Sequence, residues 1–223
     1  MRCDDPLSSA QTRPNRVKLD IVGNRAAAKW SRREQVGRVL WSVAWPFFRF
    51  SPRPFWRFRC LLLRLFGAQV GICVHLYPTV RITIPWNLAI GDHSAIGDGA
   101  ILYALGPITM GANVTVSQGA HLCAGTHDFR SPSMTLVKSS INIGDSAWIC
   151  ADAFIGPGVE IGAGAVVGAR AVAMRSVLPA LVVAGNPARK IGERQSHLDW
   201  KANAAGLRDD KSLGTTPSKP GDK

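Results

Sequence analysis

One histidine of this sequence, His127, stands in the segment GTHDF, where it could act as a base. An imidazole titrates near neutral pH, so it can take a proton from a hydroxyl group under physiological conditions. Its neighbour Asp128 could orient the ring or hold an acceptor, whereas His121, six residues earlier, is interpreted as structural. The alternative is that His127 only forms a hydrogen bond within its own loop. We expect general-base chemistry on a hydroxyl.

A second group of candidates has the chemistry to bind an anion. Arg189 and Lys190 follow a turn-forming Gly-Asn-Pro segment, and their cations suit a ligand that carries phosphate groups. Arg170 and Arg175 could serve the same ligand, and for each of these residues the alternative is a solvated surface charge. Trp148 is expected either to form a wall of a cleft or to plug the core.

A six-residue repeat must position these residues. The fourth residue after most repeat positions is Ala, Val or Ser. This period is typical of a parallel β-helix built from hexapeptides, and it does not match the 3.6-residue turn of an α-helix. Three hexapeptides form one triangular coil, so the sequence predicts an all-β fold of about five coils. The fifteen repeat positions are Val70, Leu76, Ile82, Ile90, Ile96, Leu102, Met110, Val116, Leu122, Ile143, Ile149, Ile155, Ile161, Val167 and Ala173.

The repeat is interrupted three times, and each interruption follows the third position of a coil. The interruptions fall between residues 82 and 90, 102 and 110, and 122 and 143, and the longest contains His127. Because stacked coils place equivalent residues above one another, all three insertions should leave the prism at one edge. We expect residues 182–192 to return to that edge and to form a cleft there, since insertions in solenoids collect on the functional face.

The charge of the chain is concentrated near its N-terminus. Of the 27 Arg and Lys residues in a chain of net charge +12, 14 lie within residues 1–69, against four acidic residues. No nucleic-acid recognition motif accompanies them.

Five cysteines without paired spacing fit a reducing compartment. We find no signal peptide, and the longest apolar run is about half the ~20 residues of a membrane span. A cytoplasmic location, with peripheral contact at the inner face of the plasma membrane, is expected.

Two helices are predicted before the repeat. Ser31 and Glu34 form a capping-box pattern that begins the first helix, and Pro46 is expected to end it. The second is expected to begin at Pro54 and to end before Gly67. Its apolar face is predicted to comprise Phe55, Phe58, Leu62 and Phe66.

The predicted organisation has four parts. Residues 1–30 are polar and basic, and we expect them to be disordered. Residues 31–69 are expected to cap the open end of the β-helix, or to rest as an amphipathic segment on anionic lipid. Residues 70–192 form the hexapeptide-repeat domain, and residues 193–223 a polar tail.

Several motifs together resemble those of the hexapeptide acyltransferases, which include maltose, galactoside and nodulation-factor acetyltransferases. The fuller set is similar to that of the colanic acid biosynthesis acetyltransferases of exopolysaccharide gene clusters, and the resemblance covers about residues 38–194. The motifs are GTHD, AWI, PGVEIGAGAVVGA, AGNPAR, PWNLAIGD, SQGAHLC and LLLRLFGAQVG.

The resemblance implies a left-handed β-helix, a homotrimer with active sites between subunits, and acetyl-CoA bound along the prism edge. It implies His127 as the general base of an O-acetyltransferase acting on a sugar hydroxyl of an exopolysaccharide or its lipid-linked precursor. The chain departs from many sugar transferases, which carry Thr-Lys at the positions of Met174 and Arg175. The residues implied in coenzyme binding are Trp148, Ala151, Ala169, Met174, Arg175, Asn186 and Arg189.

Two other classes remain open on the sequence. One is a non-catalytic, membrane-associated β-helix scaffold. The other is a zinc enzyme like the γ-class carbonic anhydrases, although His121 and His127 have no third histidine nearby, so no metal is expected. The acceptor sugar, the position acetylated and the choice between oxygen and nitrogen are not specified by these residues.

Overall fold

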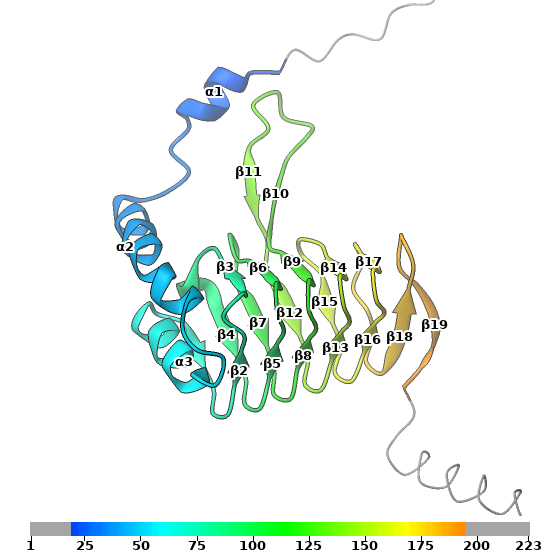
Figure 1. Ribbon diagram of the computed structural model, residues 1–223. Coiled ribbons are helices and arrows are strands. Elements are labelled where there is room, and N and C mark those ends of the chain that lie inside the picture. Colours follow the sequence, from blue (N-terminus) through cyan, green and yellow to red (C-terminus); the bar gives the residue numbers. More distant parts are fainter. Residues whose placement is uncertain (1–18, 195–223) are drawn as a thin grey trace, which may run out of the picture.

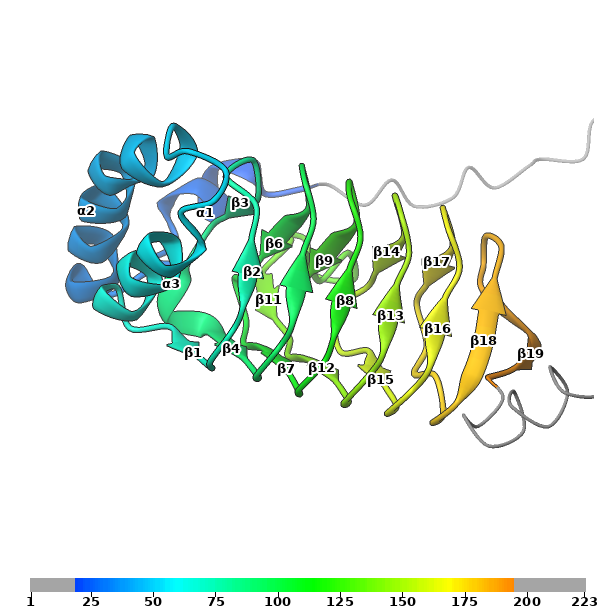
Figure 2. The ribbon, with the colours of Figure 1, turned by 60° about the horizontal axis from the view of Figure 1, so that its bottom comes forward.

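Figure 1 shows a computed structural model of the chain, which describes residues 19–194. Two helices, α2 (Arg32–Arg49) and α3 (Trp56–Leu65), lie at one end of a stack of short parallel strands, and α1 (Ile21–Ala26) lies beside a hairpin that projects from the stack. Figure 2 shows the coils side by side, with α2 and α3 covering the first coil and strands β18 (Leu181–Ala184) and β19 (Arg189–Glu193) forming the far end. No helix among the described residues is long and apolar enough to cross a membrane.

The strands form the three faces of a prism. The first sheet contains β1 (Gln69–Val70), β4 (Leu88–Ile90), β7 (Ile108–Met110), β12 (Ile141–Ile143) and β15 (Glu160–Ile161). The second contains β2 (His75–Leu76), β5 (Ala95–Ile96), β8 (Thr115–Val116), β13 (Trp148–Ile149), β16 (Val166–Val167), β18 (Leu181–Ala184) and β19 (Arg189–Glu193). The third contains β3 (Arg81–Ile82), β6 (Ile101–Tyr103), β9 (His121–Cys123), β14 (Phe154–Ile155) and β17 (Val172–Ala173).

The six-residue repeat is confirmed as the origin of these faces. Each of the fifteen repeat positions lies in a strand, and all except Val70 are buried. The register stacks them in columns; Ile149, for example, pairs with Val116 on one side and Val167 on the other. The small residues at the fourth position are buried too, because the tight turns leave no room for larger side chains.

A partial sixth coil follows the five predicted ones. Val177 pairs with Ile161 and extends the column of inward side chains in the first sheet. Val183 pairs with Val167 and extends the column in the second sheet. The repeat resumes after a step of four residues from Ala173 instead of six. The sequence did not predict this coil, because the shortened step puts Val177 and Val183 out of phase with the six-residue repeat.

The shortened step also changes where the chain leaves the prism. The turn after β18 lies against the start of β17, since Val172 N–H donates to Gly185 O (2.9 Å) and Ala188 N–H donates to Val172 O (2.9 Å). Residues 182–192 therefore meet the edge between the second and third sheets. The expectation that they share an edge with the insertions is wrong.

The helices cap the open end of the β-helix. The first coil has no neighbour on one side, so its carbonyl groups need other donors. Side chains of α2 and α3 supply them, and Arg59, which is fully buried, also reaches Ser51 Oγ (2.7 Å) and Pro52 O (2.9 Å). The capping bonds are Trp41 Nε1 to Ile82 O (2.9 Å), Arg59 Nε to Leu76 O (2.6 Å), and Arg64 Nε to Val70 O (2.9 Å).

The helices differ from their prediction in two respects. The capping box of Ser31 and Glu34 is present with both of its hydrogen bonds, but Pro46 lies inside α2 and does not end it. The last turn persists because Phe48 is buried against the core and stacks on Trp45. In α3 only half of the predicted apolar face is covered, since Leu62 and Phe66 pack against the core whereas Phe55 and Phe58 are exposed. The buried residues are Arg59, Cys60 and Leu63, because the cap needs the arginine donor on the inside.

Candidate active site

The third insertion is a hairpin that projects from the prism. It consists of β10 (Gly125–His127) and β11 (Leu136–Lys138), with His127 opposite Leu136. The insertion starts after β9 in the third sheet and ends at β12 in the first, and Figure 1 shows it standing away from the coils. The two shorter insertions also join the third sheet to the first, as predicted.

The ring of His127 has a defined orientation at the end of β10. Its Nδ1 lies 2.6 Å from the carbonyl oxygen of Met134, across the loop, while the residue as a whole is exposed. A carbonyl oxygen can only accept a hydrogen bond, so Nδ1 carries the hydrogen in this contact. The neutral ring then has its lone pair on Nε2. This is the arrangement that a general base requires.

Asp128 does not orient this ring. Its Oδ1 accepts a hydrogen bond from the backbone N–H of Arg130 (2.9 Å), and its own N–H donates to Thr135 O (2.9 Å). The carboxylate therefore shapes the loop, and the carbonyl of Met134 holds the imidazole. A contact of Asp128 with an acceptor stays a prediction.

Trp148 lies on the outer surface of the second sheet. Its side chain is 45% exposed, and its Nε1 donates to Ser117 Oγ (2.9 Å), so the core-plug alternative is wrong. Ala151 and Ala169 lie one coil apart, at the edge between the second and third sheets. Asn186 follows in the turn between β18 and β19.

The backbone N–H groups near Trp148 differ in whether they are free to donate a hydrogen bond to a ligand. Those of Trp148 and Cys150 donate within the β-helix, to Ala165 O (2.9 Å) and Val167 O (2.9 Å). Among the described residues, the N–H of Ala151 makes no hydrogen bond. A backbone N–H group that is available to a ligand is therefore found in the turn after β13, and not in the strand itself.

The cationic candidates are exposed. Arg175 and the 55%-exposed Met174 follow β17, at the edge from which the hairpin leaves. Arg189 lies at the start of β19, and within residues 19–194 neither arginine forms an ion pair. Arg170 pairs with Asp152 (3.6 Å), and Lys190 pairs with Glu193, whose pKa this contact lowers.

One chain does not gather all of these residues. His127, Met174 and Arg175 belong to the edge between the third and first sheets. Ala151, Ala169 and Asn186 belong to the edge between the second and third sheets, as the turns above show. The third sheet separates the two groups, so the single cleft expected from the sequence is not formed within one chain.

Comparison with known proteins identifies the chain. Residues 140–172 match the family described as bacterial transferase hexapeptide (six repeats). The colanic acid biosynthesis acetyltransferase WcaF of Escherichia coli (strain K12) is 46% identical over 157 residues, which cover 70% of this chain and 86% of that protein. The chain belongs to the hexapeptide-repeat acetyltransferase family. The predicted resemblance and the acyltransferase class are thereby confirmed.

Solved structures of other acetyltransferases have the same fold. The hexapeptide-repeat acetyltransferase VCA0836 of Vibrio cholerae, in complex with acetyl coenzyme A, superposes with a TM-score of 0.69 at 25% identity over 76% of this chain and 93% of that one. A galactoside acetyltransferase in complex with coenzyme A gives 0.69 at 24% identity, over 78% and 89%. The β-helix class predicted for this acetyltransferase is therefore confirmed.

Two features of the site had no signal in the sequence. One is the carbonyl of Met134 as the partner of His127, since any residue supplies a carbonyl. The other is α1, which forms within the arm that composition predicts to be disordered. Within the described residues, no group of three or more His, Cys, Asp or Glu side chains is placed to hold a metal ion.

Proposed function

We propose that this acetyltransferase transfers the acetyl group of acetyl-CoA directly to a sugar hydroxyl of an exopolysaccharide or of its lipid-linked precursor. The observation that carries the proposal is the contact between His127 Nδ1 and Met134 O (2.6 Å), which leaves Nε2 free to take a proton. Relatives named for colanic acid biosynthesis and for galactoside O-acetylation support the sugar acceptor. The acetyl-CoA complex of the V. cholerae neighbour supports the donor.

The proposed reaction has two bond changes at the acetyl carbon. His127 Nε2 takes the proton of the acceptor hydroxyl while the oxygen forms a bond to the thioester carbon. The tetrahedral intermediate then loses the thiolate of coenzyme A, which takes up the proton from the imidazolium. A backbone N–H that has no partner within residues 19–194, such as that of Ala151, is suited to stabilise the oxyanion. No covalent enzyme intermediate is required.

A homotrimer would complete this site. In one chain the base lies on one edge of the prism, and Ala151, Ala169 and Asn186 lie on another. Around a threefold axis, the hairpin edge of each subunit can face the second edge of its neighbour. The mass in solution by light scattering should be three times the 24.0 kDa of the chain. A fully active monomer would contradict this part of the proposal.

The test of the base is a single substitution. Replacing His127 by Ala should lower kcat by about 10²–10⁴-fold, the usual contribution of a general base, without changing the binding of coenzyme A in calorimetry. His93→Asn is the matched control, because His93 is exposed and has a positive φ of 58° that Asn tolerates. Activity of His127→Ala near that of the wild type would refute the mechanism.

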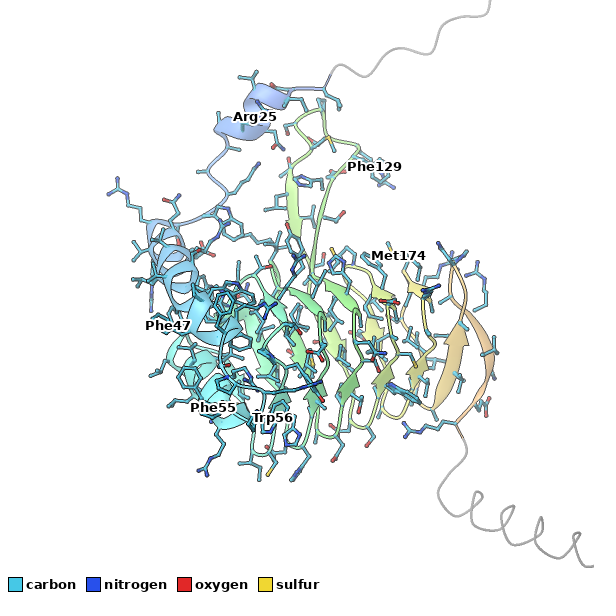
Figure 3. All side chains as sticks on the ribbon, in the orientation of Figure 1. Arg25, Phe47, Phe55, Trp56, Phe129 and Met174 are labelled. Atoms are coloured by element: carbon cyan, nitrogen blue, oxygen red, sulfur yellow. The ribbon has the colours of Figure 1, made fainter. Side chains whose placement is uncertain are left out.

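The outer face of α2 supports a membrane-side acceptor. Its exposed apolar residues recur at helical spacing; Phe47 is 66% exposed, and Phe50, which directly follows the helix, is 80% exposed. Figure 3 shows Phe47 and Phe55 on the outer side of the helical cap. The same two helices carry exposed arginines, at residues 32, 33 and 49 of α2 and residue 57 of α3. The patch comprises Val36, Val39, Leu40, Val43, Phe47, Phe50, Phe55, Leu61 and Leu65.

An apolar patch with exposed arginines on the same helices suits the surface of an anionic bilayer. The full chain should sediment with phosphatidylglycerol vesicles more than with phosphatidylcholine vesicles, and Phe47→Glu should reduce this binding. Leu178→Glu is the control, since Leu178 is an equally exposed apolar residue after the last full coil. Binding that is absent, or unchanged by Phe47→Glu, would contradict the membrane proposal.

A further inference from the structure

The segment that contains α1 is attached to the tip of the hairpin. Asp20 N–H donates to Pro132 O (2.8 Å), and the side-chain amide of Asn24 donates to Ser133 O and to Met134 O, the latter at 2.8 Å. Three successive carbonyl groups of the loop are therefore held by a segment that lies over 100 residues earlier in the chain. Figure 1 shows α1 beside the end of the β10–β11 hairpin.

The carbonyl of Met134 joins this attachment to the base. It accepts from His127 Nδ1 at 2.6 Å and from Asn24 Nδ2 at 2.8 Å, which uses both lone pairs of the oxygen. Met134 has a φ of 45°, a conformation that residues other than glycine seldom adopt without support from their surroundings. Asn24 thus holds the acceptor of the His127 hydrogen bond in a backbone conformation that is costly by itself.

The orientation of the Asn24 amide follows from a third contact. Lys29 Nζ lies 2.7 Å from Asn24 Oδ1, and an ammonium group can only donate. The oxygen of the amide therefore faces Lys29, and its nitrogen faces the two carbonyl groups. All three polar contacts of Asn24 agree with one orientation of the side chain.

We propose that Asn24 is a positioning residue for the catalytic base, acting through the carbonyl of Met134. Asn24 fixes this carbonyl, the carbonyl fixes the hydrogen on Nδ1 of His127, and Nε2 is thereby kept as the proton acceptor. The segment around α1 is then a part of the active site. The inference rests on the proposed role of His127, and it adds the residue that fixes the orientation and the tautomer of its ring.

The decisive measurement is the tautomer of His127. The chain contains five histidines, so the ¹⁵N signals of selectively labelled protein can be assigned by substituting His127. The wild-type neutral ring should show the Nδ1–H form. In Asn24→Ala the share of the Nε2–H form should rise at least several-fold, whereas Arg25→Ala, an exposed neighbour on the same helix (Figure 3), should leave the spectrum unchanged. An unchanged tautomer in Asn24→Ala would overturn the proposal.

Kinetics give a second measurement. The assay follows the rate of coenzyme A release. The acceptor is a p-nitrophenyl glycoside selected by testing a panel of such sugars, and if none reacts, the hydrolysis of acetyl-CoA by water is measured. Asn24→Ala should lower kcat about 10-fold with an unchanged KM for acetyl-CoA, because misplacement of a catalytic group affects the transition state. Asn24→Asp should lower it further, since a carboxylate cannot donate to Met134 O. Wild-type kcat in both variants would also overturn the proposal.

The two hypotheses fail in different ways. If His127→Ala retains activity, the proposed function is wrong whatever the Asn24 variants show. If His127→Ala is inactive while the Asn24 variants keep the wild-type kcat and tautomer, only the positioning role is wrong. A thermal melt of each variant, compared with that of Arg25→Ala, separates loss of fold from loss of positioning.

Discussion

The β-helix and the N-terminal segment reach a fixed structure in different ways. In the β-helix, each strand pairs with the equivalent strand of the next coil, and every coil repeats the same contact. In the N-terminal segment each contact occurs once. The side chains of Arg59, Trp41 and Asn24 donate hydrogen bonds to the backbone carbonyls of Leu76, Ile82 and Met134, respectively. The repeat supplies a rigid support, while the individual contacts close its open end and extend to the loop that holds His127.

This difference predicts how substitutions act. A change in the β-helix should disturb two neighbouring coils by loss of packing. A change in the N-terminal segment should remove one specific partner, with little that can compensate. Four substitutions test this contrast, each by urea unfolding followed by circular dichroism at a fixed protein concentration, because assembly makes stability depend on concentration.

The largest loss of stability is expected for Ile149→Ala. Ile149 is fully buried between Val116 and Val167, so the substitution removes apolar contacts on both sides and leaves a cavity. We expect a loss of about 4 kcal/mol. Thr115→Ala, at an exposed position of the neighbouring strand, should change stability by less than about 0.5 kcal/mol. Equal effects at the two positions would show that the column is not the source of stability.

The next effect is expected for Arg59→Met. Methionine retains much of the apolar volume but leaves the carbonyls of Leu76, Pro52 and Arg53 without their donor. We expect a loss of about 3 kcal/mol, since each unsatisfied buried group costs about 1–3 kcal/mol. Arg57→Met is the control, because Arg57 is exposed on the same helix. A neutral Arg59→Met would mean that packing alone closes the end of the β-helix.

A smaller effect is expected at the start of α2. Ser31 Oγ accepts from the N–H of Glu34 (3.2 Å), and Ser31→Ala removes this bond of the capping box. The expected loss is about 1 kcal/mol. Ser42→Ala should be nearly neutral, since its hydroxyl donates to a helix carbonyl in the middle of the same helix. A loss as large in Ser42→Ala would argue against the capping assignment.

The smallest effect is a pH dependence from the β-helix itself. Burial lowers the pKa of His121, whose ring packs edge-on against Tyr103 and Phe154. The unfolded state then binds the proton more readily, so this residue should make stability fall as pH drops below about 6.5. His121→Phe should remove this part of the slope while retaining the ring contacts. An identical slope in the variant would assign the pH dependence to other groups.

The sequence by itself determined the strands, the inward columns, the common edge of the three insertions and the capping box, and it led to the proposal of His127 as the base. These features are periodic or local, so each leaves a pattern within a few residues. Only the tertiary structure decided the partial sixth coil, since a step of four residues puts Val177 and Val183 out of the repeat. It also decided the separation of Asn186 from the hairpin edge and the passage of α2 through Pro46.

The same holds for the site. Residue types led to the prediction of His127 as the base, but not to what holds its ring, because a backbone carbonyl such as that of Met134 has no signature in the sequence. The contact between Asn24 and Met134 joins residues that lie 110 positions apart in the chain, so no local pattern predicts it. The repeat fixes where the hairpin begins, and the orientation of His127 depends on contacts that exist only after the N-terminal segment has docked.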